Sequence, residues 1–536
     1  MSASDARRYD AIVVGGGHNG LVAGFYLARA GLKTVVLERR PFVGGACVTE
    51  EFAPGYFASS GAYVLSMLRE AIYRDMRIVE RGLVVDPAGP SLNLFADGSH
   101  LYLHDEMEPS IEEIGRFSRG DAAAVPKFEA DLIALAKGVR PVFDWTPPDP
   151  RMRGIRDIPL LLKYGMQGFR NRKSMQDAAF LFTTSVTRFL GERFESDQVK
   201  AAYGWHAIND STAGPSTPGT AYVLLHDHAA EEVGGAARSW GFVRGGMGKL
   251  TEMMADAARE AGAEIRCDAE ASRVLTRSGR ATGVELAGGE ELRAPRVISN
   301  ADPKRTFLGL VEPEALPREF VAAIREYRCE GTSIKINLAV DALPHAEALP
   351  GDGVQPYHRG IMEMNQPLAD MDRAQNEARN GQPANEPHIE LCFPTVHDPS
   401  LAPEGKHIVT IDVNSQPYTL REDSWDDIKE SVADRAIEQL EGFFPGLSAS
   451  ILHRQVLSPL DLERQLGLTG GHALHGEMLP EQLFFMRPVR GWGDYRTPVR
   501  GLYLCGAGTH PGGGVTGANG RNCAREVLRD SRKKLA

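Results

Sequence analysis

Residues 9–38 read YDAIVVGGGHNGLVAGFYLARAGLKTVVLE, and this stretch decides the fold. An apolar run over 9–14 has strand character, a glycine loop follows, and a helical pattern comes after it. Gly15 permits the tight turn, Gly17 lets a pyrophosphate approach the backbone, and Gly20 allows helix and strand to pack closely. The order strand, glycine loop, helix therefore predicts a Rossmann-type dinucleotide-binding unit.

A carboxylate in the expected place supports this interpretation. A second strand over 34–37 ends in Glu38, 23 residues after Gly15, where such folds place the acid that binds a ribose. An acid there disfavours a 2′-phosphate, so we do not expect NADP. The free N–H groups at the start of the helix attract phosphates. We expect the cofactor to contact Gly15, Gly17, His18, Asn19, Gly20, Glu38 and Arg39.

The continuation favours FAD over NAD. Gly44 and Gly45 follow soon after the ribose acid and precede Ala46. A glycine pair lets the backbone run beside a long, bent cofactor. We therefore add Gly44, Gly45 and Ala46 to the expected FAD contacts.

The far end of the chain repeats the strand–loop–helix pattern. A buried strand over 501–505 leads into a loop with five glycines in the nine residues 506–514, and a helix is expected from Val515 to about Leu528. Backbone N–H groups and the helix dipole would stabilise negative charge on reduced flavin. We expect flavin contacts at Gly506, Ala507, Gly514 and Val515.

These two ends resemble the FAD sites of the phytoene desaturase-like branch of the amine-oxidase superfamily. The stretch GAGTHPG over 506–512 resembles the bacterial phytoene desaturase signature, and GGACVTEE over 44–51 is similar to the same branch. The resemblance implies an α/β fold in which a Rossmann-type FAD-binding domain carries an inserted α+β substrate domain. It also implies that the Val274 backbone holds the adenine.

The resemblance divides the chain between two discontinuous domains. It assigns 1–85, 240–319 and 481–536 to the FAD-binding domain, and 86–239 and 320–480 to the substrate domain. The pattern also predicts strands over 331–340 and 407–415 and a helix over 425–444. The polar stretch 371–385 is interpreted as a surface loop or an exposed helix.

Composition excludes several classes of protein. A net charge of −11 argues against a nucleic-acid-binding protein. None of the six cysteines forms a CxxC pair, which a disulfide oxidoreductase needs beside its flavin. No second complete GxGxxG unit provides a nicotinamide site and no metal-ligand motif is apparent, so we expect a quinone or oxygen as electron acceptor. No apolar run reaches the roughly 18 residues of a spanning helix, and we expect a cytoplasmic protein.

Three side chains are candidates for the chemistry. His510 lies in the C-terminal glycine loop, and His475 and Glu477 precede the last flavin segment. Flavin itself accepts the hydride, so the protein mainly supplies orientation, electrostatics and exclusion of water. Each of the three is more often structural than catalytic in such a position.

The sequence supports one main function and two alternatives. The main hypothesis is an FAD-dependent dehydrogenase, desaturase or isomerase that acts on an apolar substrate such as a polyene or isoprenoid. The first alternative is an amine-oxidase-type enzyme that uses oxygen. The second is an interaction protein without enzymatic activity that FAD stabilises.

A basic segment interrupts this acidic chain. Residues 151–193 hold nine Lys or Arg against three Asp or Glu, with apolar clusters between them. Such a surface can lie on a membrane of anionic lipids. A helix packed in the substrate domain with a solvated basic face is the more common outcome. Peripheral membrane contact is therefore a minority prediction.

Overall fold

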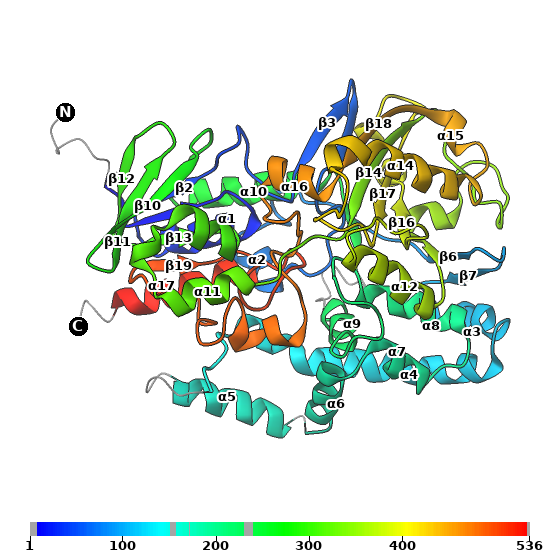
Figure 1. The fold of residues 1–536 in the computed structure, drawn as a ribbon, viewed down its shortest axis with the longest axis horizontal. Coiled ribbons are helices and arrows are strands. Elements are labelled where there is room, and N and C mark those ends of the chain that lie inside the picture. The colour runs from blue at the N-terminus through cyan, green and yellow to red at the C-terminus, as the bar shows by residue number, and fades with distance from the viewer. Residues whose placement is uncertain (1–7, 151–156, 171, 230–239, 533–536) are drawn as a thin grey trace.

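Figure 1 shows a computed structural model of the chain: a parallel sheet on the left, a larger sheet on the right and a layer of helices below. The structure describes residues 8–150, 157–170, 172–229 and 240–532. The first and the last described helices both belong to the unit on the left, where they pack against each other.

The left-hand sheet is the dinucleotide-binding sheet that the opening stretch predicts. Its five strands are all parallel. In spatial order they are β19 (Leu502–Leu504), β13 (Val297–Ser299), β1 (Ala11–Val14), β2 (Thr34–Leu37) and β9 (Glu264–Arg266). Four of the five are fully buried, as expected for parallel strands covered on both faces.

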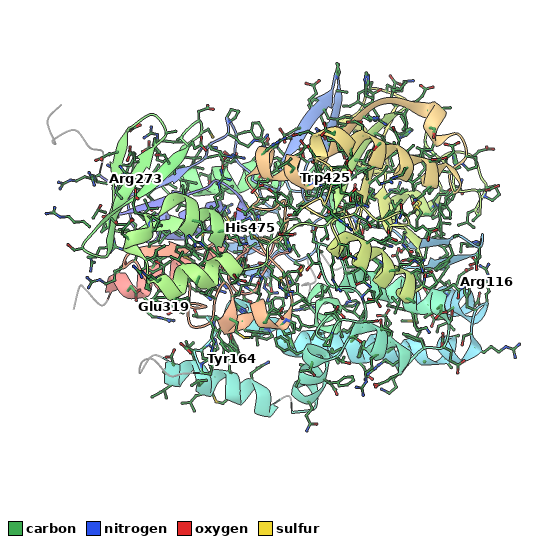
Figure 2. All side chains as sticks on the ribbon, viewed as in Figure 1. Arg116, Tyr164, Arg273, Glu319, Trp425 and His475 are labelled. Atoms are coloured by element: carbon green, nitrogen blue, oxygen red, sulfur yellow. The ribbon has the colours of Figure 1, made fainter. Side chains whose placement is uncertain are left out.

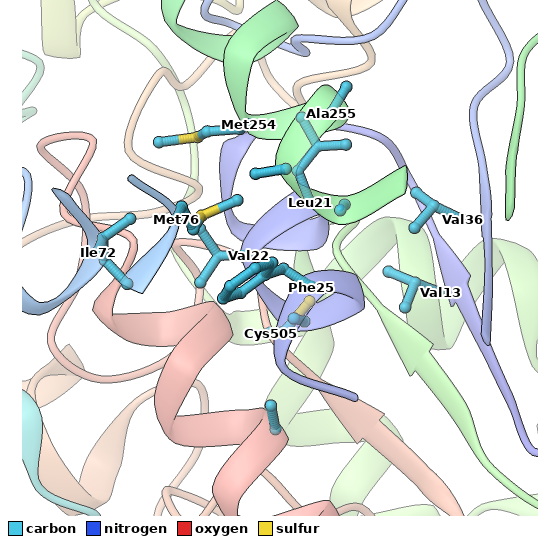
Figure 3. Packing of buried hydrophobic residues seen from close by; sticks show 14 of the residues in the cluster. Val13, Leu21, Val22, Phe25, Val36, Ile72, Met76, Met254, Ala255 and Cys505 are labelled. Carbon is cyan, nitrogen blue, oxygen red and sulfur yellow. The ribbon is translucent and has the colours of Figure 1, made fainter. Parts of the chain in front are cut away.

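One face of this sheet is covered by three helices. α1 (His18–Arg29) packs against α10 (Met247–Glu260) and α17 (Ala518–Arg532). Figure 3 shows Leu21 and Phe25 of α1 among Val13 and Val36 of the sheet. Gly24 allows this approach, because a Cβ there would lie 2.7 Å from Val36. The opposite face packs on a three-stranded antiparallel sheet. Its strands are β10 (Ala271–Arg277), β11 (Arg280–Leu286) and β12 (Glu291–Arg293).

The right-hand sheet has seven strands and is antiparallel except between β15 and β6. In spatial order they are β18 (Ile451–Leu457), β14 (Ile334–Val340), β17 (His407–Val413), β16 (Ile389–Cys392), β15 (Met362–Asn365), β6 (Ser91–Phe95) and β7 (His100–Leu103). The helix α14 (Trp425–Glu441) covers one face, with Trp425 fully buried at its start.

Helices form the lower layer. They are α3 (Met107–Gly115), α4 (Arg119–Val139), α5 (Asp157–Arg170), α6 (Arg172–Thr183), α7 (Val186–Gly191), α8 (Asp197–Gly204) and α9 (Ala221–Asp227). The remaining α-helices and β-strands of the described residues are β3 (Thr49–Ala53), β4 (Tyr56–Ser59), β5 (Val85–Pro87), β8 (Gly241–Val243), α2 (Glu70–Asp75), α11 (Arg318–Glu326), α12 (Leu368–Arg379), α13 (Pro394–His397), α15 (Leu447–Ser450) and α16 (Pro459–Leu466).

The predicted fold class is confirmed: an α/β dinucleotide fold carries an α+β unit built on the second sheet. Every strand of the parallel sheet comes from the ranges predicted for the FAD-binding domain; the exact domain boundaries stay a prediction. The exposed stretch expected over 371–385 is wrong in part. Much of it is the helix α12, whose Met371, Ala374 and Ala378 are buried against its neighbours.

Candidate cofactor site

The glycine loop has the geometry that a phosphate site needs. Gly15 has a φ of +99°, which a side chain would disfavour, and Gly17 caps the N-terminus of α1. Gly20 lies so close to the strand that a Cβ there would come within 2.1 Å of the Gly15 carbonyl oxygen. The start of α1 therefore faces outward from the sheet with its N–H groups available to an anion.

Glu38 lies where the ribose acid is expected. Its side chain is buried at the end of β2; Oε2 accepts a hydrogen bond from the Gly16 N–H at 2.8 Å, and Oε1 accepts one from the Arg40 N–H at 2.9 Å. Both bonds hold the carboxylate rigidly beside the glycine loop. A ribose hydroxyl can then donate to the remaining lone pairs of a prepositioned acceptor.

A cavity of 460 Å³ begins at this loop. It passes between the parallel sheet and the segments that lead to the substrate domain. Its walls come from seven parts of the chain: the glycine loop, the end of β2 with the residues after it, the Gly45–Ala46 turn, the segment that leads into β10, the segments 300–310 and 466–475, and Ala507. A cavity that brings together the glycine loop, the start of α1 and the carboxylate of Glu38 fits a dinucleotide.

The cavity brings together ten of the predicted residues. These are Gly15, Gly17, His18, Asn19, Glu38, Arg39, Gly45, Ala46, His475 and Ala507. The first strand, the second strand and the C-terminal loop thus meet at one site, although nearly 500 residues separate their ends in sequence. The remaining predicted residues do not line this cavity.

Gly44 and Gly506 support the backbone around the cavity. Gly44 has a φ of +135°, and a Cβ there would meet the Cys47 carbonyl oxygen at 2.7 Å. Gly506 leaves as little room for a side chain, because a Cβ there would lie 2.6 Å from the Asn300 carbonyl oxygen. Val274 lies within β10, two residues beyond the lining residue Ser272, with its side chain in the apolar core.

The C-terminal glycine loop continues beyond the residues that line the cavity. Gly514 and Val515 have φ values of +96° and +56°, and a Cβ on Gly514 would meet Met67 Sδ at 2.6 Å. Asn519 closes the loop by donating from Nδ2 to the Thr509 carbonyl oxygen at 2.9 Å. The predicted helix start at Val515 is wrong: α17 begins at Ala518, because the left-handed backbone at Val515 cannot continue a helix.

His475 lies at the centre of the molecule, between the two sheets (Figure 2). Its backbone has a φ of +55°, and its carbonyl oxygen accepts a hydrogen bond from the Tyr327 hydroxyl at 2.8 Å. Burial lowers the pKa of its imidazole, so the ring is neutral. Nδ1 is buried and has no hydrogen-bond partner among the residues described. A strained residue with an unsatisfied nitrogen in the cavity wall is a candidate cofactor contact.

The side chains of Glu477 and His510 are held by contacts with other residues of the protein. The Glu477 carboxylate accepts hydrogen bonds from Ser211 Oγ at 3.0 Å and from the Thr212 N–H at 2.7 Å. His510 Nε2 lies 3.0 Å from the Val142 carbonyl oxygen, and burial lowers the pKa of its imidazole to about 4. Neither side chain lines the cofactor cavity. Glu477 thus ties its own segment to residues 211–212, and His510 ties the C-terminal glycine loop to the segment at Val142.

Arg487 is a buried residue whose hydrogen bonds hold several loops together, and the sequence did not predict this role. All five of its N–H groups donate to backbone carbonyl oxygens at 2.8–3.2 Å. The acceptors are Leu474, Gly476, Glu477, Gln482 and Ala507. The buried guanidinium therefore ties the segment around His475 to the C-terminal flavin loop.

Other wall residues were missed because they belong to no motif. Asn300 packs its side chain against the glycine loop, since Cβ atoms on Gly15 and Gly17 would lie within 3.3 Å and 2.8 Å of it. Arg305 and the 466–468 segment close the outer end near Arg39, whose Nη2 donates to the Gln465 carbonyl oxygen at 2.7 Å. Of these residues, only Asn300 could have been found from the sequence, because it directly follows the strand over 297–299.

These features together fit FAD. The helix start offers N–H groups to a diphosphate, Glu38 offers an acceptor to a ribose, and glycines replace side chains that would fill the cavity. A Cβ on Gly45, for example, would lie 3.1 Å from Gly17 Cα.

Comparison with known proteins agrees with this geometry. A family described as flavin containing amine oxidoreductase matches residues 20–528. The chain is 40% identical over 547 aligned positions to pyridine nucleotide-disulfide oxidoreductase domain-containing protein 2 of Rattus norvegicus, and the alignment covers 97% of this chain and 94% of the rat protein. It is 27% identical to a subunit of limonene dehydrogenase from Castellaniella defragrans, covering 98% of this chain and 96% of that protein.

The fold also matches solved structures. An oxidoreductase from Methanosarcina mazei superposes with a TM-score of 0.61 at 16% identity, covering 97% of this chain and all of the other. At that identity the likeness shows the fold alone.

Proposed function

The chain belongs to the flavin containing amine oxidoreductase family, and we propose that it is an FAD-dependent dehydrogenase, desaturase or isomerase of apolar substrates such as polyenes and isoprenoids. FAD is its cofactor, and the protein is an oxidoreductase. The finer proposal draws support from the relative named as a subunit of limonene dehydrogenase, which matches along nearly the whole chain. It also agrees with the desaturase-like loop over 506–512.

Different residues of this chain bind different parts of the cofactor. Glu38 binds the ribose of the adenosine half, and the start of α1 binds the diphosphate through its N–H groups. The Gly45–Ala46 turn and Ala507 also line the cavity. When bound there, FAD supplies an acceptor for hydride. Arg487 holds the segments at Leu474 and Ala507 together.

The single observation that carries the proposal is the cavity itself, in which the N-terminal glycine loop, Glu38 and Ala507 of the C-terminal loop meet. The test is spectroscopic. The purified protein should be yellow, and an anaerobic panel of terpenes and polyenes should include a compound that bleaches the flavin absorbance. A panel without any bleaching, on protein that dithionite reduces normally, would contradict the proposed substrate class.

The electron acceptor and the cellular setting are also proposals. We propose a quinone or oxygen as acceptor, and a cytoplasmic protein that binds no nucleic acid. Within the described residues, no helix has the length and apolar character to cross a bilayer.

We further propose peripheral contact with a membrane through α5. This helix lies at the edge of the molecule (Figure 1) and exposes Ile158, Leu162 and Met166, which are 43%, 61% and 57% exposed. Their spacing of four residues places them on one face of the helix. Lys163 is exposed beside them, and the basic residues of 151–156 adjoin them in sequence but lie outside the described residues.

A further inference from the structure

Two histidines from distant parts of the chain line the cofactor cavity. His18 is the first residue of α1 and follows the glycine loop, and His475 lies in the segment 466–475. Both side chains keep some exposure, although the residues lie in the interior of the molecule. These two imidazoles, here called the histidine pair, therefore border the space in which FAD binds.

Close contacts through Asn300 place His475 beside the glycine loop. A Cβ on Gly17, the residue before His18, would lie 2.8 Å from Asn300 Nδ2. A Cβ on Gly506 would lie 2.6 Å from the Asn300 carbonyl oxygen and 3.2 Å from His475 Nδ1. The diphosphate of a dinucleotide binds at such a loop, on the N–H groups of the helix start. Both imidazoles are therefore near the position of the diphosphate.

The protein itself satisfies the histidine pair poorly. His18 Nδ1 lies 3.6 Å from Cys47 Sγ, and sulfur is a weak hydrogen-bond partner. His475 Nδ1 is buried and has no partner among the described residues. Buried polar atoms in native proteins are normally hydrogen-bonded. The pair therefore has hydrogen-bonding capacity left for a ligand.

Without a ligand, both imidazoles are neutral. Burial, and then the charge of His475, lowers the pKa of His18 to about 3. Burial also lowers the pKa of His475. The position of His18 at the positive end of the helix dipole further disfavours a cation there. An anion bound at the helix start would reverse this preference, because an opposite charge nearby favours the ionised form of an imidazole.

The groups packed around the pair supply little negative charge. Asp302 raises the pKa of His475, whereas the buried guanidinium of Arg487 lowers it. Burial lowers the pKa of His472 to about 3, and it raises the pKa of the Cys47 thiol to about 12, so both are uncharged. The Tyr327 hydroxyl donates to the His475 carbonyl oxygen. A charged imidazole in this place therefore needs an anion from outside the chain.

The cavity wall also carries other charged side chains. They are Glu38, Arg39, Arg40, Glu270 and Arg305. Arg39 and Arg305 lie together at the outer end, since a Cβ on Gly467 would lie 3.2 Å from Arg39 Nη2 and 3.6 Å from Arg305 Cζ. Arg40 forms an ion pair with Glu50. Among the lining residues, the histidine pair is thus the basic group adjacent to the start of α1.

We propose that His18 and His475 bind the diphosphate of FAD together and take up one proton from the solvent when it binds. The diphosphate brings two negative charges to the positive end of α1. A hydrogen bond from a charged imidazole to a phosphate oxygen is about twice as strong as a neutral one. No covalent bond of the cofactor changes. The inference rests on the FAD site and holds for any substrate.

The test is the pH dependence of FAD binding by the full-length chain after removal of its flavin. The diphosphate of FAD keeps its two charges from pH 8 to pH 6, so a change in affinity reports on the protein. Quenching of flavin fluorescence should show affinity about tenfold higher at pH 6 than at pH 8, within the limit of tenfold per pH unit for one proton. Calorimetry at pH 6 in two buffers of different ionisation enthalpy should show uptake of about one proton.

Two further ligands locate the proton. ADP-ribose contains the same diphosphate without the flavin ring, and adenosine lacks the diphosphate. ADP-ribose should show the pH dependence of FAD, and adenosine should show none. A pH dependence confined to FAD would assign the proton to the flavin ring and overturn the proposal.

Variants of the pair test the residues themselves. His18→Gln and His475→Asn should each bind FAD at least fivefold more weakly than the wild type at pH 6, with a smaller difference at pH 8. Asparagine is chosen at 475 because it tolerates the φ of +55° there. The control is His100→Gln in β7, the outermost strand of the seven-stranded sheet (Figure 1), which should bind FAD as the wild type does.

The holoprotein provides a second measurement if the chain does not stay folded without flavin. Release of FAD should then be slower at pH 6 than at pH 8 in the wild type, and each variant should reduce this difference. FAD binding that is independent of pH in the wild type, or a pH dependence that both variants keep, would overturn the proposal. Neither result bears on the substrate class, which the anaerobic bleaching of flavin tests separately.

Discussion

Glu38 shows how one residue serves both the protein and the cofactor. Its two hydrogen bonds to backbone N–H groups fix the carboxylate beside the glycine loop before any ligand arrives. A preorganised acceptor gains more from a ribose hydroxyl than a mobile one, because no side-chain entropy is lost on binding.

We predict that Glu38→Gln lowers the affinity for FAD about tenfold or more, since hydrogen bonds to a charged group contribute about 1.5–3 kcal/mol. The measurement is the FAD dissociation constant of the deflavinated protein, by quenching of flavin fluorescence. Glu285→Gln, which breaks a surface ion pair with Arg273, is the control and should bind FAD normally. Unchanged affinity in Glu38→Gln would exclude the ribose contact.

Arg487 is the residue whose loss should cost the most stability. Replacing it by Met leaves five buried carbonyl oxygens without their donor. We predict that Arg487→Met lowers the free energy of unfolding by about 3 kcal/mol or more, because unsatisfied buried groups retain their full desolvation cost. Urea unfolding measures this. A loss below about 1 kcal/mol would mean that the loop at His475 holds its shape without the guanidinium.

At the scale of elements, α5 is the helix for which we propose contact with a membrane. Its inner side packs Tyr164 against Trp145, whereas its outer side exposes Leu162 and Met166. We predict that Leu162→Glu with Met166→Glu lowers binding to vesicles of anionic phospholipid at low salt at least fivefold, by removing apolar contact and adding negative charge. Sedimentation with the vesicles measures binding.

The matched control for α5 is a pair of substitutions on another exposed helical face. Lys127→Glu with Lys137→Glu on α4 changes the net charge by the same sign without touching the apolar stripe. If the α4 variant lost binding equally, attraction would be general and α5 would have no special role. Wild-type protein that stays in solution with every vesicle would remove the membrane proposal.

Sequence alone predicted those elements that a local pattern determines. The glycine loop, β2 and Glu38 follow from spacing within about thirty residues, and β19 with its loop follows from the same pattern. Arg305, Arg487 and the line of paired side chains formed by Lys335, Asp412, Glu390 and Glu363 could not be predicted in this way. Their roles arise only when distant strands pair, because register places Lys335 beside Asp412 and Glu363 beside Glu390. The start of α17 was misplaced for a similar reason, since tertiary contacts hold Val515 in a left-handed conformation.

At the scale of the whole molecule, buried histidines couple folding to pH. His510 illustrates the effect: burial lowers its pKa from 6.5 to about 4 in the folded chain. Between these values the unfolded chain binds a proton that the folded chain does not, so stability falls as the pH drops from about 6.5 toward 4. His226 and His472 are shifted in the same direction for the same reason.

We predict that His510→Gln, which keeps a donor for the Val142 carbonyl oxygen, gains on the wild type as the pH falls through this window. The gain should approach about 1.4 kcal/mol per pH unit, the free energy of one proton per unit. Urea unfolding at pH 7.5, 6.0 and 5.0 measures the difference. A difference that does not change with pH would mean that the ring titrates normally.

The buried carboxyl group of Glu363 in β15 should give the opposite sign, which separates it from the histidines. Burial raises the pKa of Glu363, so above about pH 4.5 the folded chain holds a proton that the unfolded chain has lost, and stability falls as the pH rises. We predict that Glu363→Gln therefore gains on the wild type from pH 5 to pH 8, by up to about 1.4 kcal/mol per pH unit. The same unfolding series measures it. A gain toward low pH instead would show that Glu363 is ionised in the folded protein, with a protonated His388 compensating its charge. Relative to the wild type, His510→Gln should therefore become more stable as the pH falls, and Glu363→Gln should become more stable as the pH rises.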